Sequence, residues 1–313
     1  MRPIPQPLCQ GPFARLQALE LGLTRDVLEG RRFRRLHQGV YCHRDHVLTW
    51  DDRVRAAALA LPPGARTTGA TRLRQLGLDV GDRYPLHFVV DGDLHLTLAG
   101  VFLHRTAKMP PHQDDGVSAE AAFVAFCADA LTIDAIAVGS VLLHRLALDM
   151  QRLDQLLTEE RWRRGVPETS YVLPFLDARC RSLPEAELLT YVVFSGLPIP
   201  EVNETITLAD GTELTPDQRF VDYDLVLEYE GSQHQEDRRQ YNVDIDRYAA
   251  YRRNHVAYEQ VTKERMRSPK ATVRTVHRAL VRCGYDGPPP DFDGLWAMLF
   301  RPLRDVVRAR RAA

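Results

Sequence analysis

The feature that most constrains the fold is a short apolar strand that ends in two acidic residues. Residues 225–227, Leu-Val-Leu, have the aliphatic and β-branched character of a buried strand, and Gly231 ends it. Glu228 and Glu230 are two positions apart, so on an extended chain their side chains point to the same face. Such carboxylates repel each other unless a positive charge lies between them. A hard cation such as Mg²⁺ supplies that charge, and with Asp217 just before the strand the sequence predicts a metal site.

Composition limits the class of protein. A chain of 313 residues, 44% of them apolar, is long enough for about two globular domains. A formal net charge of −1 excludes a uniformly basic surface, so nucleic-acid binding would depend on local patches. Five scattered cysteines without a CxxC pair indicate neither a zinc site nor a disulfide framework, which favours a reducing cytoplasm. No apolar stretch approaches the roughly 18 residues of a membrane span, so we expect a cytoplasmic protein with no membrane partner.

The N-terminal segment has the spacing of a helix-turn-helix. Residues 13–21 carry apolar side chains at helical intervals and end at Gly22, and Thr24 is placed to cap a second helix over 25–29. A strand and turn follow at 36–41, which completes a winged-helix pattern. In such modules the second helix enters the major groove of DNA, and nearby arginines contact phosphates or bases. The candidate DNA-binding residues of this segment are Arg31, Arg32, Arg34 and Arg35. The alternative is that these arginines form a solvated structural face.

The rest of the first 165 residues predicts helices around a small β region. Residues 86–104 alternate well enough for two or three strands with a turn at Asp91-Gly92. Histidines on separate strands are more often partners of backbone or exposed groups than metal ligands. Helical periodicity dominates 117–160 and carries no evident chemistry.

A domain boundary is expected near 165–182, and a small α/β module follows it. Ser182 begins a helix whose first turn contains Glu185. This glutamate either favours the positive end of the helix dipole or faces the predicted metal site. Strands around 201–208 and 218–229 come next, followed by a helix, a strand and a last helix.

The C-terminal segment, 291–313, predicts a basic amphipathic helix after a proline-rich connector. Leu299, Leu303 and Val307 form its apolar face. The arginines opposite either extend a DNA footprint, since each neutralised phosphate adds salt-dependent affinity, or form the solvated face of a packed helix. These arginines are Arg301, Arg304, Arg308, Arg310 and Arg311.

The α/β module resembles a nuclease family. The residues that carry the resemblance are Pro216-Asp217, Glu228-Tyr229-Glu230-Gly231, Gln233-His234, Tyr241, Asp244 and Arg247. They are similar to the very-short-patch-repair-like (Vsr-like) endonuclease domains of the PD-(D/E)XK superfamily, found in many actinobacterial proteins. The resemblance covers about 182–285. It implies a restriction-endonuclease-like α/β fold and phosphodiester hydrolysis that depends on Mg²⁺ or Mn²⁺.

The resemblance also implies roles for residues at matching positions. It makes Glu185, Asp217 and Glu228 the metal ligands. Asp217, Glu228, Glu230 and His234 become the catalytic set, with His234 orienting the attacking water or protonating the leaving oxygen. Arg247 is implied to contact a DNA phosphate.

Two positions depart from the family pattern. Glu230 stands where the superfamily has a lysine, although the Vsr-like branch commonly has an acid there. Gln260 stands where the family often has an arginine, which removes one phosphate contact.

The segment from Gly11-Pro12-Phe13 through Gly39-Val40-Tyr41 resembles the N-terminal winged-helix domain of AbiEi-type antitoxins, the transcriptional regulators of type IV toxin–antitoxin pairs. Its joining to a Vsr-like domain is a recurrent combination. The expected fold class is therefore α+β and α/β in two domains. A winged-helix region with a helical and β middle spans 1–165, the nuclease domain spans 182–285, and the basic helix spans 291–313.

The leading functional hypothesis is a metal-dependent DNA endonuclease with an N-terminal DNA-binding module. One alternative is a DNA-binding antitoxin or repressor that has a degenerate nuclease domain and a toxin as partner. Another is a scaffold that neither cuts nor binds DNA. From the residues alone, Glu228 and Glu230 at a solvent edge and Asp217 as a turn cap also remain open.

Overall fold

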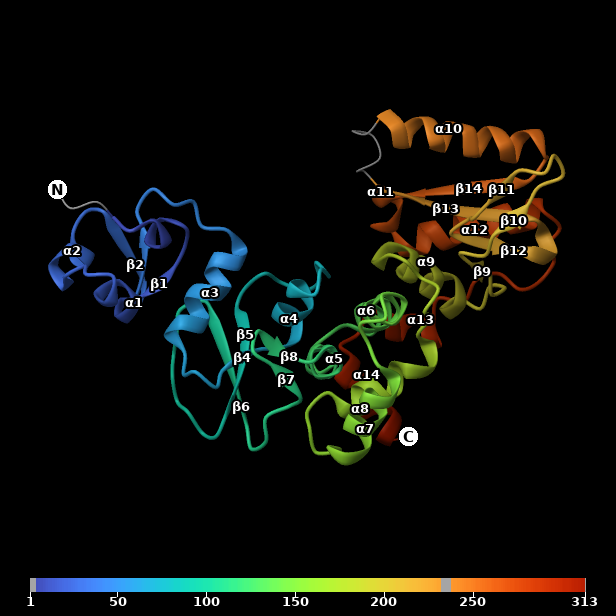
Figure 1. Cartoon of the computed structure of the whole chain (residues 1–313). Helices are drawn as coiled ribbons and strands as arrows, with labels where there is room; N and C mark the ends of the chain where they lie inside the picture. The colour runs from blue at the N-terminus through green and yellow to red at the C-terminus, as the bar shows by residue number, and fades with distance from the viewer. Residues whose placement is uncertain (1–3, 232–237, 313) are drawn as a thin grey trace. The chain divides into compact units, whose positions relative to one another are not determined.

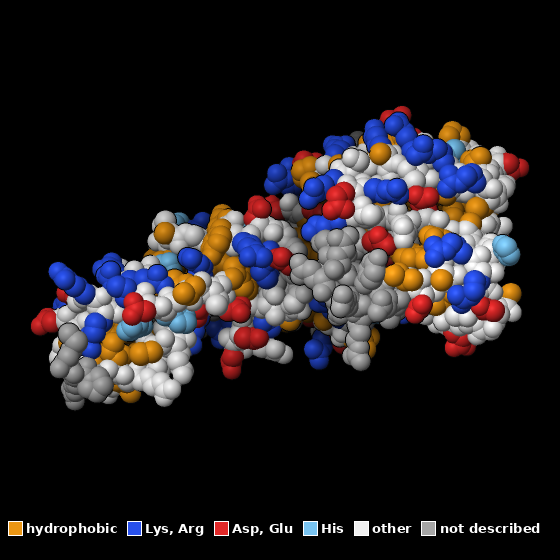
Figure 2. Space-filling view, turned by 90° about the horizontal axis from the view of Figure 1, so that it is seen from above, with side chains coloured by type: hydrophobic (Ala, Val, Ile, Leu, Met, Phe, Trp, Pro, Cys, Tyr) orange, Lys and Arg blue, Asp and Glu red, His pale blue; other side chains and the backbone are white. Residues whose placement is uncertain are grey.

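The computed structural model describes residues 4–231 and 238–312, except for the side chains of 238–244. The chain divides into two compact units, Met1–Ala122 and Phe123–Ala313 (Figure 1). Both units combine helices with small sheets, which confirms the predicted mixture of α and β structure. The boundary predicted near 165–182 lies within the second unit, and the domain limits at 165 and 182 stay a prediction. Acidic and basic side chains are interspersed on the face shown in Figure 2, in keeping with the net charge of −1.

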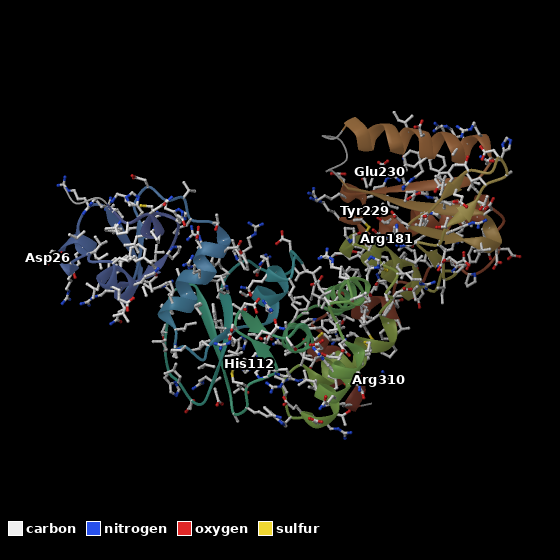
Figure 3. The ribbon with its side chains drawn as sticks, viewed as in Figure 1. Asp26, His112, Arg181, Tyr229, Glu230 and Arg310 are labelled. Atoms are coloured by element: carbon white, nitrogen blue, oxygen red, sulfur yellow. The ribbon has the colours of Figure 1, made fainter. Side chains whose placement is uncertain are left out.

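The first unit begins with a pair of short helices and a three-stranded sheet. In chain order these elements are η1 (Gln6–Cys9), β1 (Phe13–Ala14), α1 (Arg15–Glu20), α2 (Arg25–Glu29), β2 (Phe33–His37) and β3 (Val40–His43). The strands are antiparallel in the order β1-β3-β2. Asp26 lies in the first turn of α2, where a carboxylate is favoured by the helix dipole (Figure 3).

Three details of this segment differ from the sequence-based expectation. The first helix begins at Arg15 because Phe13 pairs with Tyr41 in the sheet. Thr24 is the N-terminal flanking residue of α2, but its side chain makes no capping hydrogen bond. Strand β2 begins at Phe33, so the arginine cluster extends onto the strand itself.

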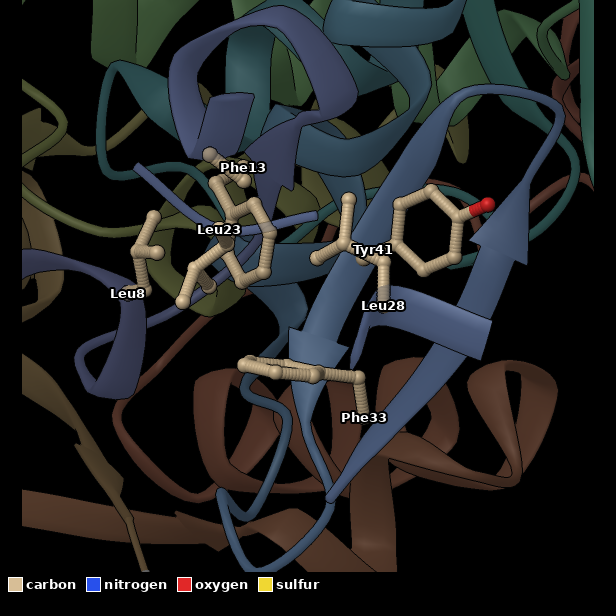
Figure 4. Packing of buried hydrophobic residues seen from close by; sticks show 7 residues of the cluster. Leu8, Phe13, Leu23, Leu28, Phe33 and Tyr41 are labelled. Carbon is tan, nitrogen blue, oxygen red and sulfur yellow. The ribbon is translucent and has the colours of Figure 1, made fainter. Parts of the chain in front are cut away.

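A small apolar core holds the helix pair against the sheet (Figure 4). Its buried residues are Leu8, Phe13, Ala18, Leu23, Leu28, Phe33 and Tyr41. The rings of Phe13 and Phe33 meet edge to face with centroids 5.6 Å apart, a favourable geometry for aromatic pairs. This core joins every element of the segment from η1 to β3.

The remainder of the first unit is a helix pair with two further small sheets, one of three strands and one of two. Its elements are α3 (Trp50–Ala60), β4 (Arg66–Thr67), α4 (Gly69–Gln75), β5 (Leu86–Asp91), β6 (Val101–Thr106), β7 (His112–Gln113) and β8 (Gly116–Val117). Strands β5 and β6 are parallel, so the turn expected at Asp91-Gly92 does not close a hairpin. His87 on β5 and His104 on β6 lie 2.9 Å apart between Nδ1 and Nε2, and they are therefore partners of each other.

The second unit surrounds a four-stranded sheet with helices. The helices before the sheet are α5 (Ala119–Cys127), α6 (Thr132–His144), α7 (Met150–Glu159), α8 (Val166–Val172), η2 (Leu173–Phe175) and α9 (Leu183–Phe194). Helix α5 spans the division between the two units. The C-terminal segment forms α13 (Gly294–Leu299) and α14 (Leu303–Ala312) rather than one helix, because Pro302 separates them and bridges to Leu131. Among the helices of the described residues, none is long and apolar enough to cross a membrane.

The sheet of the second unit has the order β14-β13-β12-β9. The elements from the sheet onward are β9 (Glu201–Val202), β10 (Ile206–Thr207), β11 (Glu213–Leu214), β12 (Gln218–Phe220), η3 (Val221–Tyr223), β13 (Leu225–Glu230), α10 (Arg238–Arg253), β14 (Ala257–Thr262), α11 (Lys263–Met266) and α12 (Pro269–Arg282). Helix α10 connects the parallel strands β13 and β14 and covers one face, and α9 and α12 lie on the other (Figure 1).

Leu227 lies at the centre of this sheet, and it provides a test of the packing. Its side chain is fully buried on β13, which pairs with β12 and β14. We expect Leu227→Ala to lower the free energy of unfolding of the second unit by about 2–5 kcal/mol, through lost burial and a residual cavity. Denaturant unfolding of the full chain measures this. The control is Val221→Ala, at an exposed position just before the strand. It should change the free energy of unfolding by less than about 0.5 kcal/mol. Equal losses of stability in the two variants would contradict the placement of Leu227 at the centre of the sheet.

Candidate active site

The end of β13 places two glutamates against helix α10. Leu225–Leu227 are buried, and the strand ends at Glu230, before Gly231, as predicted. Tyr251 Oη donates to Glu228 Oε1 at 2.8 Å, and Tyr248 Oη donates to Glu230 Oε1 at 3.0 Å. Both glutamates therefore face the same helix, as the two-residue spacing predicts.

Asp217 lies directly across from Glu228. Gln218, the first residue of β12, pairs with Leu227, so Asp217, which comes just before the strand, lies opposite Glu228. The backbone N–H of Tyr229 donates to Asp217 Oδ2 at 2.8 Å, and the backbone N–H of Asp217 donates to Glu228 Oε2 at 3.4 Å. Burial, followed by the negative charges of Glu228 and Glu185, raises the pKa of Asp217 to about 7. The site thus brings carboxylates together although their negative charges repel each other, and a bound cation would reduce this repulsion.

Glu228 is the most deeply buried acid of the site, with 2% of its side chain exposed. Besides Tyr251, Arg247 contacts it, with Nη1 3.3 Å from Oε2. Burial and the charge of Glu228 raise the pKa of Tyr251, which keeps this hydroxyl a hydrogen-bond donor. Arg247, predicted to contact a phosphate, is therefore at the site but engaged by an acid.

Glu185 is close to the acid pair, yet its carboxylate is occupied by the start of α9. Oε1 accepts from Ser182 Oγ at 2.8 Å, and Oε2 accepts from the backbone N–H of Arg181 at 3.0 Å and from Asn203 Nδ2 at 2.9 Å. Of the two roles open for Glu185 from the sequence, this geometry matches the stabilisation of the helix N-terminus. Its charge still acts on Asp217.

Several residues that organise the site were missed by sequence reasoning. Gln218 is fully buried and donates from Nε2 to the backbone oxygen of Glu185 at 3.2 Å, which ties β12 to α9. Asn203 has a positive φ of 54° and donates to Glu185. Tyr248 and Tyr251 recur three positions apart on one face of α10, a spacing that could have indicated their common role.

Glu230 is held by neutral groups. It accepts from Gln260 Nε2 at 2.9 Å as well as from Tyr248. Gln260, at the position where the family often has an arginine, is therefore a partner of the strand-end acid. His234 lies outside the described residues.

The donor set fits a divalent metal only in part. Among the described residues no group of three or more His, Cys, Asp and Glu side chains is arranged to hold a metal ion. Asp217 and Glu228 nevertheless offer two adjacent carboxylates, and Mg²⁺ is commonly held by one or two carboxylates together with waters and substrate phosphates. The pair therefore offers two of the carboxylates that a Mg²⁺ or Mn²⁺ ion could use, and Glu185 would take part only by giving up hydrogen bonds.

The predicted DNA-binding arginines of the first unit differ in surroundings. Arg31 and Arg35 are exposed, whereas Arg32 is half-buried. Arg34 donates from Nη2 to the backbone oxygen of His46 and is part of the fold of the segment. Arg31 and Arg35 are thus the better candidates for a contact with a polyanion.

The pKa of Asp217 predicts a pH dependence of stability. The folded protein binds a proton at Asp217 up to a pH of about 7, whereas an ordinary aspartate releases it near 3.8. Stability should therefore fall as the pH rises across this interval. We expect Asp217→Asn to reduce this fall, measured as the melting temperature of the second unit from pH 4 to pH 8. Asp222→Asn, at an exposed neighbouring acid, should retain it; an unchanged profile in Asp217→Asn would contradict the assignment.

Comparison with known proteins gives a partial match. No family model matches the chain, and no solved structure matches it. Two proteins of Mycobacterium tuberculosis are each 30% identical over 96 residues, which cover 31% of this chain and 35% of the relative: the uncharacterized protein MT2308 of strain CDC 1551 / Oshkosh and the uncharacterized protein Rv2248 of strain ATCC 25618 / H37Rv. The chain thus spans about a third of the length of the curated relatives that it matches.

Proposed function

We propose that this protein is a metal-dependent DNA endonuclease whose N-terminal segment binds DNA. The observation that carries the proposal is the pair of Asp217 and Glu228 at the end of a central strand, where burial and then the charge of Glu228 raise the pKa of Asp217. Strained acid pairs of this kind are a feature of functional sites. The order of elements from α9 through β9, β12, β13, α10, β14 and α12 also supports the proposal, because it suits the restriction-endonuclease-like fold that the resemblance implies.

In this proposal Asp217 and Glu228 hold Mg²⁺ or Mn²⁺. The ion, when bound, supplies positive charge that polarises the scissile phosphate and lowers the pKa of the attacking water. Tyr251 orients Glu228, and the backbone N–H of Tyr229 orients Asp217. Arg247, with 29% of its side chain exposed, is placed to turn from Glu228 toward a DNA phosphate.

Glu230 and His234, the two remaining members of the predicted catalytic set, have different roles in the proposal. Glu230 acts as a positioning residue, because Tyr248 and Gln260 hold it on the α10 side. His234 keeps its proposed role in orienting water or protonating the leaving oxygen.

A DNA-binding antitoxin or repressor is the second candidate. The observations that favour it are the hydrogen bonds that occupy Glu185 and the contact of Arg247 with Glu228, since both reduce the groups available to a metal. The N-terminal helix pair and hairpin would then bind an operator, and a toxin would be the protein partner.

Cleavage assays test the first candidate. Supercoiled, linear, single-stranded and mismatched DNA are incubated with the full chain and Mg²⁺ or Mn²⁺. We expect Asp217→Ala and Glu228→Gln each to lower the cleavage rate at least about 100-fold, equivalent to roughly 2.7 kcal/mol of transition-state stabilisation. Asp222→Ala should cleave like the wild type. Cutting that persists in both site variants would reveal a contaminant. A chain that cuts no substrate and melts at the same temperature with and without metal would support the repressor.

The N-terminal arginines give a separate prediction that both candidates share. Arg31→Ala and Arg35→Ala should each weaken duplex DNA binding and reduce the slope of log K against log salt concentration by about 0.9. Fluorescence anisotropy at several salt concentrations measures this. Arg83→Ala, an exposed arginine of the same unit that pairs with Asp79, is the control. Equal slopes for all four proteins would remove Arg31 and Arg35 from the interface.

A further inference from the structure

A cavity of about 590 Å³ lies between helices α7, α8 and α14 of the second unit. None of these helices carries Asp217 or Glu228, and the cavity is therefore separate from the candidate active site. Its volume lies within the roughly 300–1,000 Å³ that is usual for small-molecule sites.

Three arginines dominate the charge of this cavity. Arg161 follows α7, and Arg310 and Arg311 are in the last turn of α14, whereas Asp154 is the single acid of the lining. Among the described side chains no ion pair includes any of these three arginines. Neighbouring arginines, in contrast, do have acidic partners: Arg163 pairs with Glu160, and Arg164 and Arg304 pair with Asp129. The lining thus carries three exposed arginines against one acid, an excess of positive charge.

The lining of the cavity combines polar and apolar side chains and includes one aromatic ring. Leu157, Val166 and Val307 are buried beneath it. The guanidinium carbon of Arg310, a residue labelled in Figure 3, lies 5.5 Å from the ring centroid of Tyr171, and this cation–π contact positions the arginine over the lining. The Tyr171 hydroxyl is directed to Met298 Sδ at 3.6 Å, so the ring rather than the hydroxyl is available to the cavity.

We propose that this cavity binds a small phosphorylated molecule, with the phosphate on Arg161, Arg310 and Arg311 and an apolar portion on Leu157 and Val307. Guanidinium groups match phosphate oxygens in geometry and charge. Thr158, which also lines the cavity, supplies a hydroxyl donor, whereas the hydroxyl of Ser170 donates to the backbone oxygen of Val166. A duplex backbone would use the arginines but not the apolar side chains of Leu157, Val166 and Val307 between the helices, which is why the observations favour a small ligand over DNA.

Isothermal titration calorimetry on the full chain tests this proposal. The probes are inorganic pyrophosphate, adenosine diphosphate and adenosine. We expect pyrophosphate and adenosine diphosphate to bind, the nucleotide more tightly, and adenosine to bind far more weakly than the nucleotide. Arg161→Ala and Arg310→Ala should each weaken binding of the diphosphate at least about tenfold, the effect of losing one charge-assisted hydrogen bond.

Arg308→Ala is the matched control. Arg308 is exposed on the same helix and is not part of the lining, so its loss should change affinity by less than about twofold. The melting temperature of each variant shows whether it is folded. Absence of binding by both phosphate probes, or equal effects of all three substitutions, would overturn the proposal. Duplex DNA binding that depends on Arg161 and Arg310, without pyrophosphate binding, would overturn it in favour of a nucleic-acid surface.

Discussion

The second unit depends on the compensation of one buried carboxylate, Glu228. An ionised carboxylate in an apolar interior is very unfavourable unless it is hydrogen-bonded and balanced in charge. Tyr251 and Arg247, both on α10, supply a hydrogen bond and a positive charge. The same contacts attach α10 to the centre of the sheet at the point where β13 ends, so the requirement to stabilise an acid also fixes the position of a helix.

Asp217 adds a second acid that this arrangement does not fully compensate. The strand register places it opposite Glu228, and its pKa rises because the position is buried and because a second negative charge beside Glu228 is unfavourable. On the opposite side of the strand ladder, Gln218 connects β12 to the first turn of α9, and Glu185 stabilises that turn. The acids therefore lie between two helix attachments, and moving either helix would change the separation of the carboxylates.

The local part of this arrangement was predictable from the sequence. The Leu-Val-Leu run and Gly231 define the strand and its end, and the spacing of Glu228 and Glu230 defines their common face. Their partners were not predictable, since Tyr251 and Gln260 reach the glutamates only after α10 and β14 have packed. The role of Glu185 remained open for the same reason, because Asn203 comes from a separate strand end. The expected turn at Asp91-Gly92 failed since local turn signals do not distinguish a hairpin from a crossover to a parallel strand.

The contact between Arg247 and Glu228 links the two ligands of the proposed nuclease. A divalent cation on Glu228 would compete with the guanidinium for the same carboxylate oxygen, while a DNA phosphate would attract Arg247 away from the acid. The metal and the DNA would therefore each increase the affinity for the other. The reason is that the free energy needed to separate Arg247 from Glu228 would be spent by whichever ligand binds first. Without DNA the arginine balances the buried acid, which would lower the affinity of the proposed site for a metal. With DNA bound, the two carboxylates would be left with their mutual repulsion, which a cation would relieve.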